Sequence, residues 1–104
     1  MSTLRIALNQ IDPTLMAEGS RGRRVVRLQK VLRLAGCYTG FVDGVFGAQT
    51  RRAIEILQRY YGQPITGIFD PSLWHSLSLD ACYPTELIEA CRRHKRNAQQ
   101  AQHV

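Results

Sequence analysis

A five-residue pattern, Thr-Gly-x-x-Asp, occurs twice in the middle of this chain, at residues 39–43 and 66–70. Each copy follows a glycine that interrupts a helical pattern, Gly36 in the first case and Gly62 in the second. Glycine adopts backbone angles that a residue with a Cβ resists, and an Asp side chain can bond to nearby amides and fix a turn. We therefore expect two tight loops of similar construction, each joining one helix to the next, with Gly40 at a positive φ.

Helical periodicity flanks both loops. Residues 23–35 and 48–61 each place their apolar side chains on one face, which predicts two amphipathic helices. A third, shorter helix is expected to begin at Asp70, because its carboxylate can cap the first turn and Pro71 suits the first helical position. A fourth helix is expected over residues 83–96, since its basic end complements a helix C-terminus.

The N-terminal residues are compatible with two local structures. Leu4, Ile6 and Leu8 alternate with polar residues as in a β-strand. Leu4, Leu8 and Ile11 also fall on one face of a helix. The sequence leaves both alternatives open.

An ordered series of residues connects these elements between about Leu15 and Leu77. In order and spacing this series resembles the peptidoglycan-binding-like domain family. One departure is that Leu57 precedes Gln58 where the family more often has an aromatic residue; one apolar residue replaces another, so the expected fold is unchanged. The series runs Gly22-x-x-Val25-x-x-Leu28-Gln29-x-x-Leu32, Gly36-x-Tyr38-x-Gly40-x-x-Asp43-Gly44-x-Phe46-Gly47-x-x-Thr50, Ala53, Leu57-Gln58, Gly62, Thr66-Gly67-x-x-Asp70 and Trp74-x-x-Leu77.

The resemblance implies an all-α fold, a compact three-helix bundle. We expect this domain to span residues 15–79, with an N-terminal extension at residues 1–14 and a basic helix with a frayed tail at residues 80–104. It also implies a function, the non-catalytic recognition of peptidoglycan, because such domains usually accompany a cell-wall hydrolase and hold it on its polymer. The alternative is a cytoplasmic subunit or adaptor that reuses the fold to bind another protein.

A ligand made of sugars and peptide requires hydrogen-bonding groups beside an aromatic surface. One loop and the adjacent helix start supply such groups, and we expect them to converge as a binding site. The alternative, that they are ordinary turn and surface residues, stays open. Phe46, Thr50 and Trp74 are expected to pack in the core rather than contact ligand. The candidate ligand-binding residues are Tyr38, Thr39, Asp43, Arg51 and Arg52.

Enzymatic chemistry finds no support in the sequence. The three histidines are scattered, and no pair has the i, i+4 spacing that places two imidazoles on one metal. No cysteine pair has zinc-ligand spacing, and no nucleophile elbow or phosphate-binding loop is present. Asp43 and Asp70 are better explained as turn and cap residues than as a catalytic pair. We expect neither catalysis nor a metal or cofactor.

The charge of the chain is strongly positive. The formal net charge is +6, and residues 21–33 contain six basic residues and no acid. Such a run is usually a solvated face, but it also favours acidic partners. An acidic protein partner fits the adaptor alternative. Nucleic acid is less favoured, because no aromatic residues are interleaved with the basic ones as a single-strand binder requires.

Targeting and cysteine content bear on location. Residues 1–20 lack the run of about 7–15 apolar residues that a secretory signal requires. No stretch approaches the roughly 18 apolar residues that span a membrane. The three cysteines, Cys37, Cys82 and Cys91, are an odd number, which favours free thiols in a reducing compartment. The alternative is that Cys82 and Cys91 pair in an oxidising compartment, which nothing in the sequence requires. As written, the chain is expected in the cytoplasm, and at the cell wall only if another route exports it.

Overall fold

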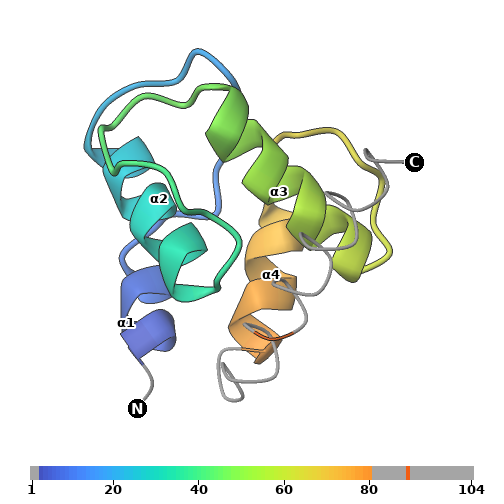
Figure 1. Ribbon diagram of the computed structural model, residues 1–104. Helices are drawn as coiled ribbons and strands as arrows, with labels where there is room; N and C mark the ends of the chain where they lie inside the picture. Colours follow the sequence, from blue (N-terminus) through green and yellow to red (C-terminus); the bar gives the residue numbers. More distant parts are fainter. Residues whose placement is uncertain (1–2, 81–88, 90–104) are drawn as a thin grey trace.

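The computed structural model describes residues 3–80 and residue 89, and within these residues the fold is all-α. The last three helices are joined by two loops, which we call the first loop (residues 36–47) and the second loop (residues 62–70), and residues 10–22 connect the first two helices (Figure 1). The described residues contain no β-strand, only two isolated bridges. The predicted helical bundle is therefore confirmed. The four helices are α1 (Thr3–Asn9), α2 (Arg23–Leu34), α3 (Ala48–Tyr60) and α4 (Pro71–Asp80).

The N-terminal segment forms a helix, not a strand. Leu4, Leu8 and Ile11 are buried, whereas Ile6 is 48% exposed, which is the pattern of the helical alternative. The indole N–H of Trp74 on α4 lies 3.3 Å from the carbonyl oxygen of Leu8 and 3.1 Å from that of Ile11. Trp74 therefore packs structurally, as expected, and fixes the end of α1 against α4.

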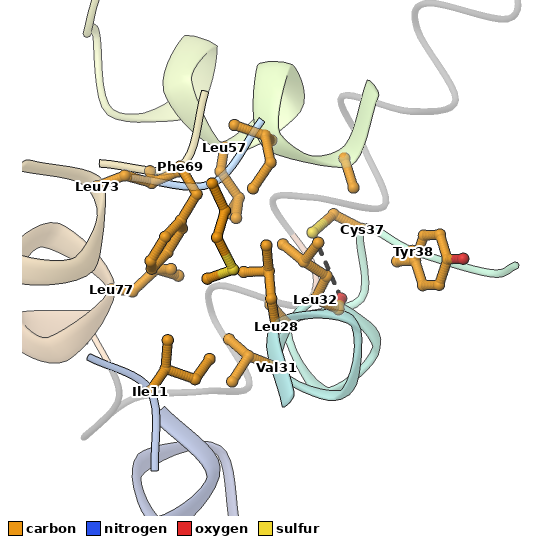
Figure 2. Close-up of a cluster of buried hydrophobic side chains, with 14 of the residues drawn as sticks. Ile11, Leu28, Val31, Leu32, Cys37, Tyr38, Leu57, Phe69, Leu73 and Leu77 are labelled. Atoms are coloured by element: carbon orange, nitrogen blue, oxygen red, sulfur yellow. Dashed lines mark hydrogen bonds between the residues drawn. The ribbon is translucent and has the colours of Figure 1, made fainter. Parts of the chain in front are cut away.

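One hydrophobic core lies between the four helices. Ile11, Leu28, Leu57 and Leu77 point toward one another from different parts of the chain, with Phe69 of the second loop among them (Figure 2). Phe46 of the first loop is 1% exposed, so it anchors that loop as predicted. Burying apolar surface of this kind stabilises the fold by about 25 cal/mol for each Å² removed from water.

Both long helices end in the same way. Gly36 follows α2 with a φ of 84°, and Gly62 follows α3 with a φ of 68°. In each case the next amide bonds back to a carbonyl five residues earlier, Cys37 to Leu32 at 3.1 Å and Gln63 to Gln58 at 2.9 Å. These are Schellman motifs, which favour glycine at the left-handed position. The predicted helix ends are confirmed.

The two loops share a clamp made by one buried glutamine each. Gln29 on α2 accepts hydrogen bonds from the Asp43 and Gly44 amides, at 3.1 and 3.0 Å, and donates to the Val45 carbonyl at 3.0 Å. Gln58 on α3 repeats this pattern with residues 66–68, at 3.0, 3.0 and 3.1 Å. The expectation of two similarly built loops is confirmed.

The register of that repeat differs from the one predicted. Asp43-Gly44 corresponds to Thr66-Gly67, because both glycines are buried with φ near +77° and +74° and both follow a side chain that accepts the amide two residues on. Gly40 has no positive φ, so the prediction for Gly40 was wrong. The Thr-Gly-x-x-Asp pattern pairs Gly40 with Gly67, but the glycine that corresponds to Gly67 is Gly44. The pattern does not reveal which glycine amide bonds to the buried glutamine.

The segment between α1 and α2 holds both loops in place. Met16 pairs with Phe69 of the second loop through two backbone hydrogen bonds of 3.0 and 2.8 Å. Arg21 forms a bridge with Val45, and the Gly22 amide donates to the Gly44 carbonyl at 3.0 Å. Backbone hydrogen bonds from this segment therefore hold both loops, in addition to the hydrogen bonds from Gln29 and Gln58.

Several expectations concern residues outside the described ones: the helix at residues 83–96, the frayed tail, and the state of Cys82 and Cys91. Cys37 is buried, with its Sγ 3.4 Å from the Leu32 carbonyl oxygen, as expected for a small core side chain. None of the described helices combines the length and apolar character needed to cross a bilayer. Asp70 caps α4 as predicted, accepting the Leu73 amide at 2.8 Å.

Candidate functional site

In residues 39–42, which we call the crest, the first loop exposes the aromatic ring of Phe41 to solvent. Phe41 is 87% exposed, the highest value among the exposed large hydrophobic residues of the described chain. Exposing apolar surface is unfavourable in water, and an exposed aromatic ring on a fixed loop backbone offers a face that a ligand can cover. The loop backbone around Phe41 is therefore the natural starting point for a binding surface.

The buried side chain of Tyr38 fixes the backbone of the crest. Its ring is 7% exposed and lies at the edge of the core with its hydroxyl pointing outward (Figure 2). The hydroxyl donates to the Phe41 carbonyl oxygen at 2.6 Å and lies 3.4 Å from Nε2 of Gln29. Because the ring is buried, Tyr38 offers no face for stacking and instead fixes the backbone of Phe41.

Gly40 allows the start of α3 to lie against the loop. A Cβ at this position would meet the side-chain oxygen of Gln49 and would come within 2.8 Å of the Tyr38 hydroxyl oxygen. Gln49 is exposed and belongs to the first turn of α3. The Gln49 side chain therefore lies directly beside Gly40, and the buried Tyr38 ring is what leaves little room for a Cβ there.

Asp43 is part of the loop's internal support. Its carboxylate accepts the Val45 amide at 3.0 Å and lies 3.1 Å from Nε2 of Gln29. These two hydrogen bonds hold the pKa of Asp43 below its usual value of 3.8, and the bond from the Val45 amide has the larger effect. Thr50 joins the same group, since its buried hydroxyl accepts from Gln29 at 3.2 Å, consistent with the expectation that it packs.

Arg51 and Arg52 lie on different sides of α3. Arg51 forms an ion pair with Glu18 at 3.0 Å and lies 3.9 Å from Glu55, and its side chain covers Gly67 of the second loop. Arg52 is exposed, and successive positions on a helix are about 100° apart. Arg51 therefore points to the second loop, away from the position that Arg52 occupies.

The structure brings together three of the five candidate residues in the first loop. Thr39 is exposed beside Gly40, and Tyr38 and Asp43 make hydrogen bonds within the loop. Sequence reasoning missed Phe41 and Gln49. The signal for Phe41 was present, because a large aromatic residue outside any helical or alternating pattern, between Gly40 and Gly44, has no core position to fill.

A separate hollow lies between the C-terminal ends of α3 and α4. Its volume is about 430 Å³, and it contains none of the residues singled out from the sequence. Among the described residues no group of three His, Cys, Asp or Glu side chains could hold a metal ion. The hollow is lined by Tyr60, Tyr61, Ser76, Leu79 and Asp80.

The crest surface has a defined chemistry. The exposed groups are the ring of Phe41 and the hydroxyl of Thr39 in the first loop, the amide of Gln49 at the start of α3, and the guanidinium of Arg52, three positions after Gln49 on the same helix. Apolar ring faces suit the C–H faces of sugars, and the polar groups suit hydroxyl, amide and carboxylate partners. Such a surface can bind a glycan or a peptide, and its groups bind rather than activate.

Comparison with protein families finds one match over residues 21–77, to the family described as "Putative peptidoglycan binding domain". The matched residues include α2, the first loop, α3, the second loop and most of α4. They therefore contain every candidate ligand-binding residue named above.

Known proteins similar to this chain include a spore cortex-lytic enzyme and an amidase. The spore cortex-lytic enzyme of Bacillus cereus is 41% identical over 54 residues, which are 52% of this chain and 21% of that protein. The N-acetylmuramoyl-L-alanine amidase CwlM of Mycobacterium tuberculosis is 46% identical over 56 residues, 54% of this chain and 14% of that protein. The chain thus corresponds to a small part of each relative.

The fold also resembles a solved structure, the crystal structure of the SleB N-terminal domain. The TM-score is 0.63 with 32% sequence identity, and the match covers 68% of this chain and 97% of that one. The match therefore extends over almost the whole of a separately solved domain.

Proposed function

The chain belongs to the peptidoglycan-binding domain family, and from this premise we propose that it is a non-catalytic module that recognises peptidoglycan through the crest of its first loop. The observation that carries the proposal is Phe41, an 87% exposed ring whose backbone is pinned by the buried Tyr38. A rigidly presented aromatic ring binds a sugar face without losing loop entropy on contact.

The five residues predicted from the sequence take two kinds of role in this proposal. Thr39 and Arg52 contact the ligand, as hydroxyl and guanidinium partners of glycan and peptide groups. Tyr38 and Asp43 position the first loop, and Arg51 ties α3 to the second loop and to Glu18. Phe41 and Gln49 complete the ligand contacts.

The absence of catalysis is supported by what the described carboxylates do. Asp43 accepts a turn amide and Asp70 caps α4. Glu18 forms an ion pair with Arg51 at 3.0 Å, and Glu55 lies 3.9 Å from the same guanidinium. These acids are engaged in structure, so we assign the chain binding alone.

The relatives suggest where the module acts. Their names describe enzymes that cleave spore cortex or an amidase acting on an N-acetylmuramoyl group, and this chain corresponds to 21% and 14% of those proteins. We propose that the chain acts at the cell wall, where it holds itself or an associated hydrolase on the polymer.

The test is sedimentation with purified sacculi, with competition by soluble disaccharide-peptide fragments. We predict that the wild-type protein pellets and that the fragments release it. Phe41→Ala should weaken binding about tenfold or more, as expected for a central aromatic contact. Leu79→Ala is the matched control. Leu79 is also a large apolar side chain, 78% exposed, but it lines the hollow at the ends of α3 and α4 and not the first loop.

Two results would refute the proposal. If the wild-type protein stays in the supernatant at low and moderate salt, peptidoglycan is not its ligand and the adaptor alternative becomes the better one. If Leu79→Ala weakens binding and Phe41→Ala does not, the module binds through the hollow at the ends of α3 and α4.

A further inference from the structure

The outer face of α2 carries a concentration of positive charge that the proposed function does not use. Six basic residues lie between positions 21 and 33, and all are exposed. Arg23 and Lys30 are seven positions apart, or two turns, so they lie on the same side of the helix. We call Arg23, Lys30 and Arg33 the cationic face.

No described acid neutralises this face. The ion pairs of the described residues both involve Arg51 on α3. Arg24 donates to the hydroxyl of Thr14, and Arg27 lies 3.5 Å from the Gln10 carbonyl oxygen, so both bond to neutral groups and keep their charge. The side chains of the cationic face make no hydrogen bond or ion pair with the described residues.

The cationic face adjoins the crest of the first loop. Val26 lies against Gly44 of that loop, where an added Cβ would come within 3.1 Å of a Val26 methyl carbon. Lys30 and Arg33 are four and seven positions after Val26, on the same side of α2. Figure 1 shows the first loop running beside α2. A ligand held at Phe41 can therefore extend over the cationic face.

We propose that the cationic face is a second contact surface for peptidoglycan, which binds the carboxylates of peptide stems next to the glycan held at the crest. This inference rests on the proposed function. Guanidinium groups suit carboxylates because they form paired, charge-assisted hydrogen bonds. Residues 21–34 contain no aromatic side chain on which a base could stack, which favours a carboxylate polymer over single-stranded nucleic acid.

The experiment compares native sacculi with sacculi whose carboxylates have been converted to neutral amides by carbodiimide and methylamine. The double variant Arg23→Gln/Lys30→Gln lowers the net charge by two. Arg59→Glu on α3 is the matched control, because it lowers the net charge by the same two at an exposed position away from the cationic face. Thermal unfolding of each variant verifies that it is folded.

We expect the double variant to bind native sacculi about three- to tenfold more weakly than wild type at low salt, as for two exposed charge contacts. Arg59→Glu should bind as wild type does. The difference between the double variant and wild type should vanish at about 0.5 M salt, where screening is strong, and on amidated sacculi at any salt.

Several outcomes would overturn the inference. One is equal binding of the double variant and wild type to native sacculi. Another is that the double variant loses as much affinity for amidated sacculi as for native ones. A third is that Arg59→Glu loses as much affinity for native sacculi as the double variant does. A double variant that binds sacculi normally but loses affinity for duplex DNA would assign the face to nucleic acid instead. Wild-type protein that binds neither kind of sacculus refutes the proposed function itself, whereas binding that ignores the double substitution refutes only the cationic face.

Discussion

Gly40 and Gly44 lie in the same loop and are required for different physical reasons. Gly44 is buried with a φ of 77°, a conformation that other residues adopt at a cost. Gly40 has an ordinary backbone conformation but lies so close to Tyr38 and Gln49 that no Cβ fits. A sequence pattern identifies both as glycine and does not separate these two causes.

The close packing at Gly40 can be tested by comparing two serine substitutions. Gly40→Ser should destabilise the protein by about 1–3 kcal/mol, because the new Cβ overpacks against the fixed Tyr38 ring. Gly47→Ser should be close to neutral, since a Cβ there meets nothing within 4 Å and serine is favoured at the start of a helix. Denaturant unfolding measures both, and equal stability of the two variants would show that Gly40 is not tightly packed.

Asp43 gives the fold a pH dependence whose direction follows from its lowered pKa. Hydrogen bonds from the Val45 amide and from Gln29 stabilise the charged form in the folded state, so the folded pKa is below the unfolded one. The contribution to stability is complete above the unfolded pKa, about 3.9, and is lost as the pH falls through the folded pKa.

Asp43→Asn should remove this contribution. We predict that the wild type has the higher Tm at pH 6 and that its advantage shrinks steadily as the pH is lowered below about 4. Thermal unfolding from pH 6 to pH 2.5 measures the difference. A difference in Tm that stays constant over this range would show that the Asp43 carboxylate has no special stabilisation in the folded state.

At the scale of elements, the central device is the glutamine clamp that closes each loop. Gln29 and Gln58 are 0% and 1% exposed, and each satisfies two loop amides and one loop carbonyl. Buried backbone groups without partners cost free energy, so these two side chains replace the hydrogen bonds that regular structure would provide. Two irregular loops can thereby pack against the core.

Removing one clamp should cost far more than removing a surface glutamine. Gln29→Ala leaves the Asp43 and Gly44 amides and the Val45 carbonyl without that partner, and we predict a loss of about 2–4 kcal/mol. Gln63→Ala is the control, because Gln63 is half-buried and bonds outward to Ser76 and the Ser72 carbonyl, and it should cost about 1 kcal/mol or less. Similar losses of unfolding free energy in both variants would contradict the clamp.

The helices were predictable because their signals are local. The apolar faces of α2 and α3, the glycines that end them and the Asp70 cap all act within a few residues. The N-terminal segment was ambiguous because α1 has only seven residues. What settles it is the contact of Trp74 with Leu8 and Ile11, more than 60 positions earlier in the chain, which no local pattern contains.

The candidate site was predicted less well than the fold. Sequence placed Tyr38, Thr39 and Asp43 in one loop, but it did not show that Tyr38 would be buried or that Phe41 would be exposed. It also grouped Arg51 with Arg52, although adjacent helix positions point in different directions. Which way a side chain points depends on the packing of α3 between the two loops.

At the scale of the whole molecule, the first loop and α2 lie side by side on a small core, and together they make up the recognition surface that we propose. The loop carries an exposed ring on a backbone fixed by Tyr38, Gln29 and Gly40. The adjoining side of α2 carries positive charges without described acidic partners. An exposed aromatic ring and exposed cationic groups on adjoining elements match a polymer of sugars that bears acidic peptide stems.

The most direct test of peptidoglycan recognition by the crest is an NMR titration of the ¹⁵N-labelled chain with a soluble disaccharide-peptide fragment of peptidoglycan. We predict saturable shifts of the amides of residues 39–42 and 48–52, and loss of those shifts in Phe41→Ala. Shifts that gather instead around Tyr60 and Leu79, or no saturable shifts at all, would contradict recognition through the crest of the first loop.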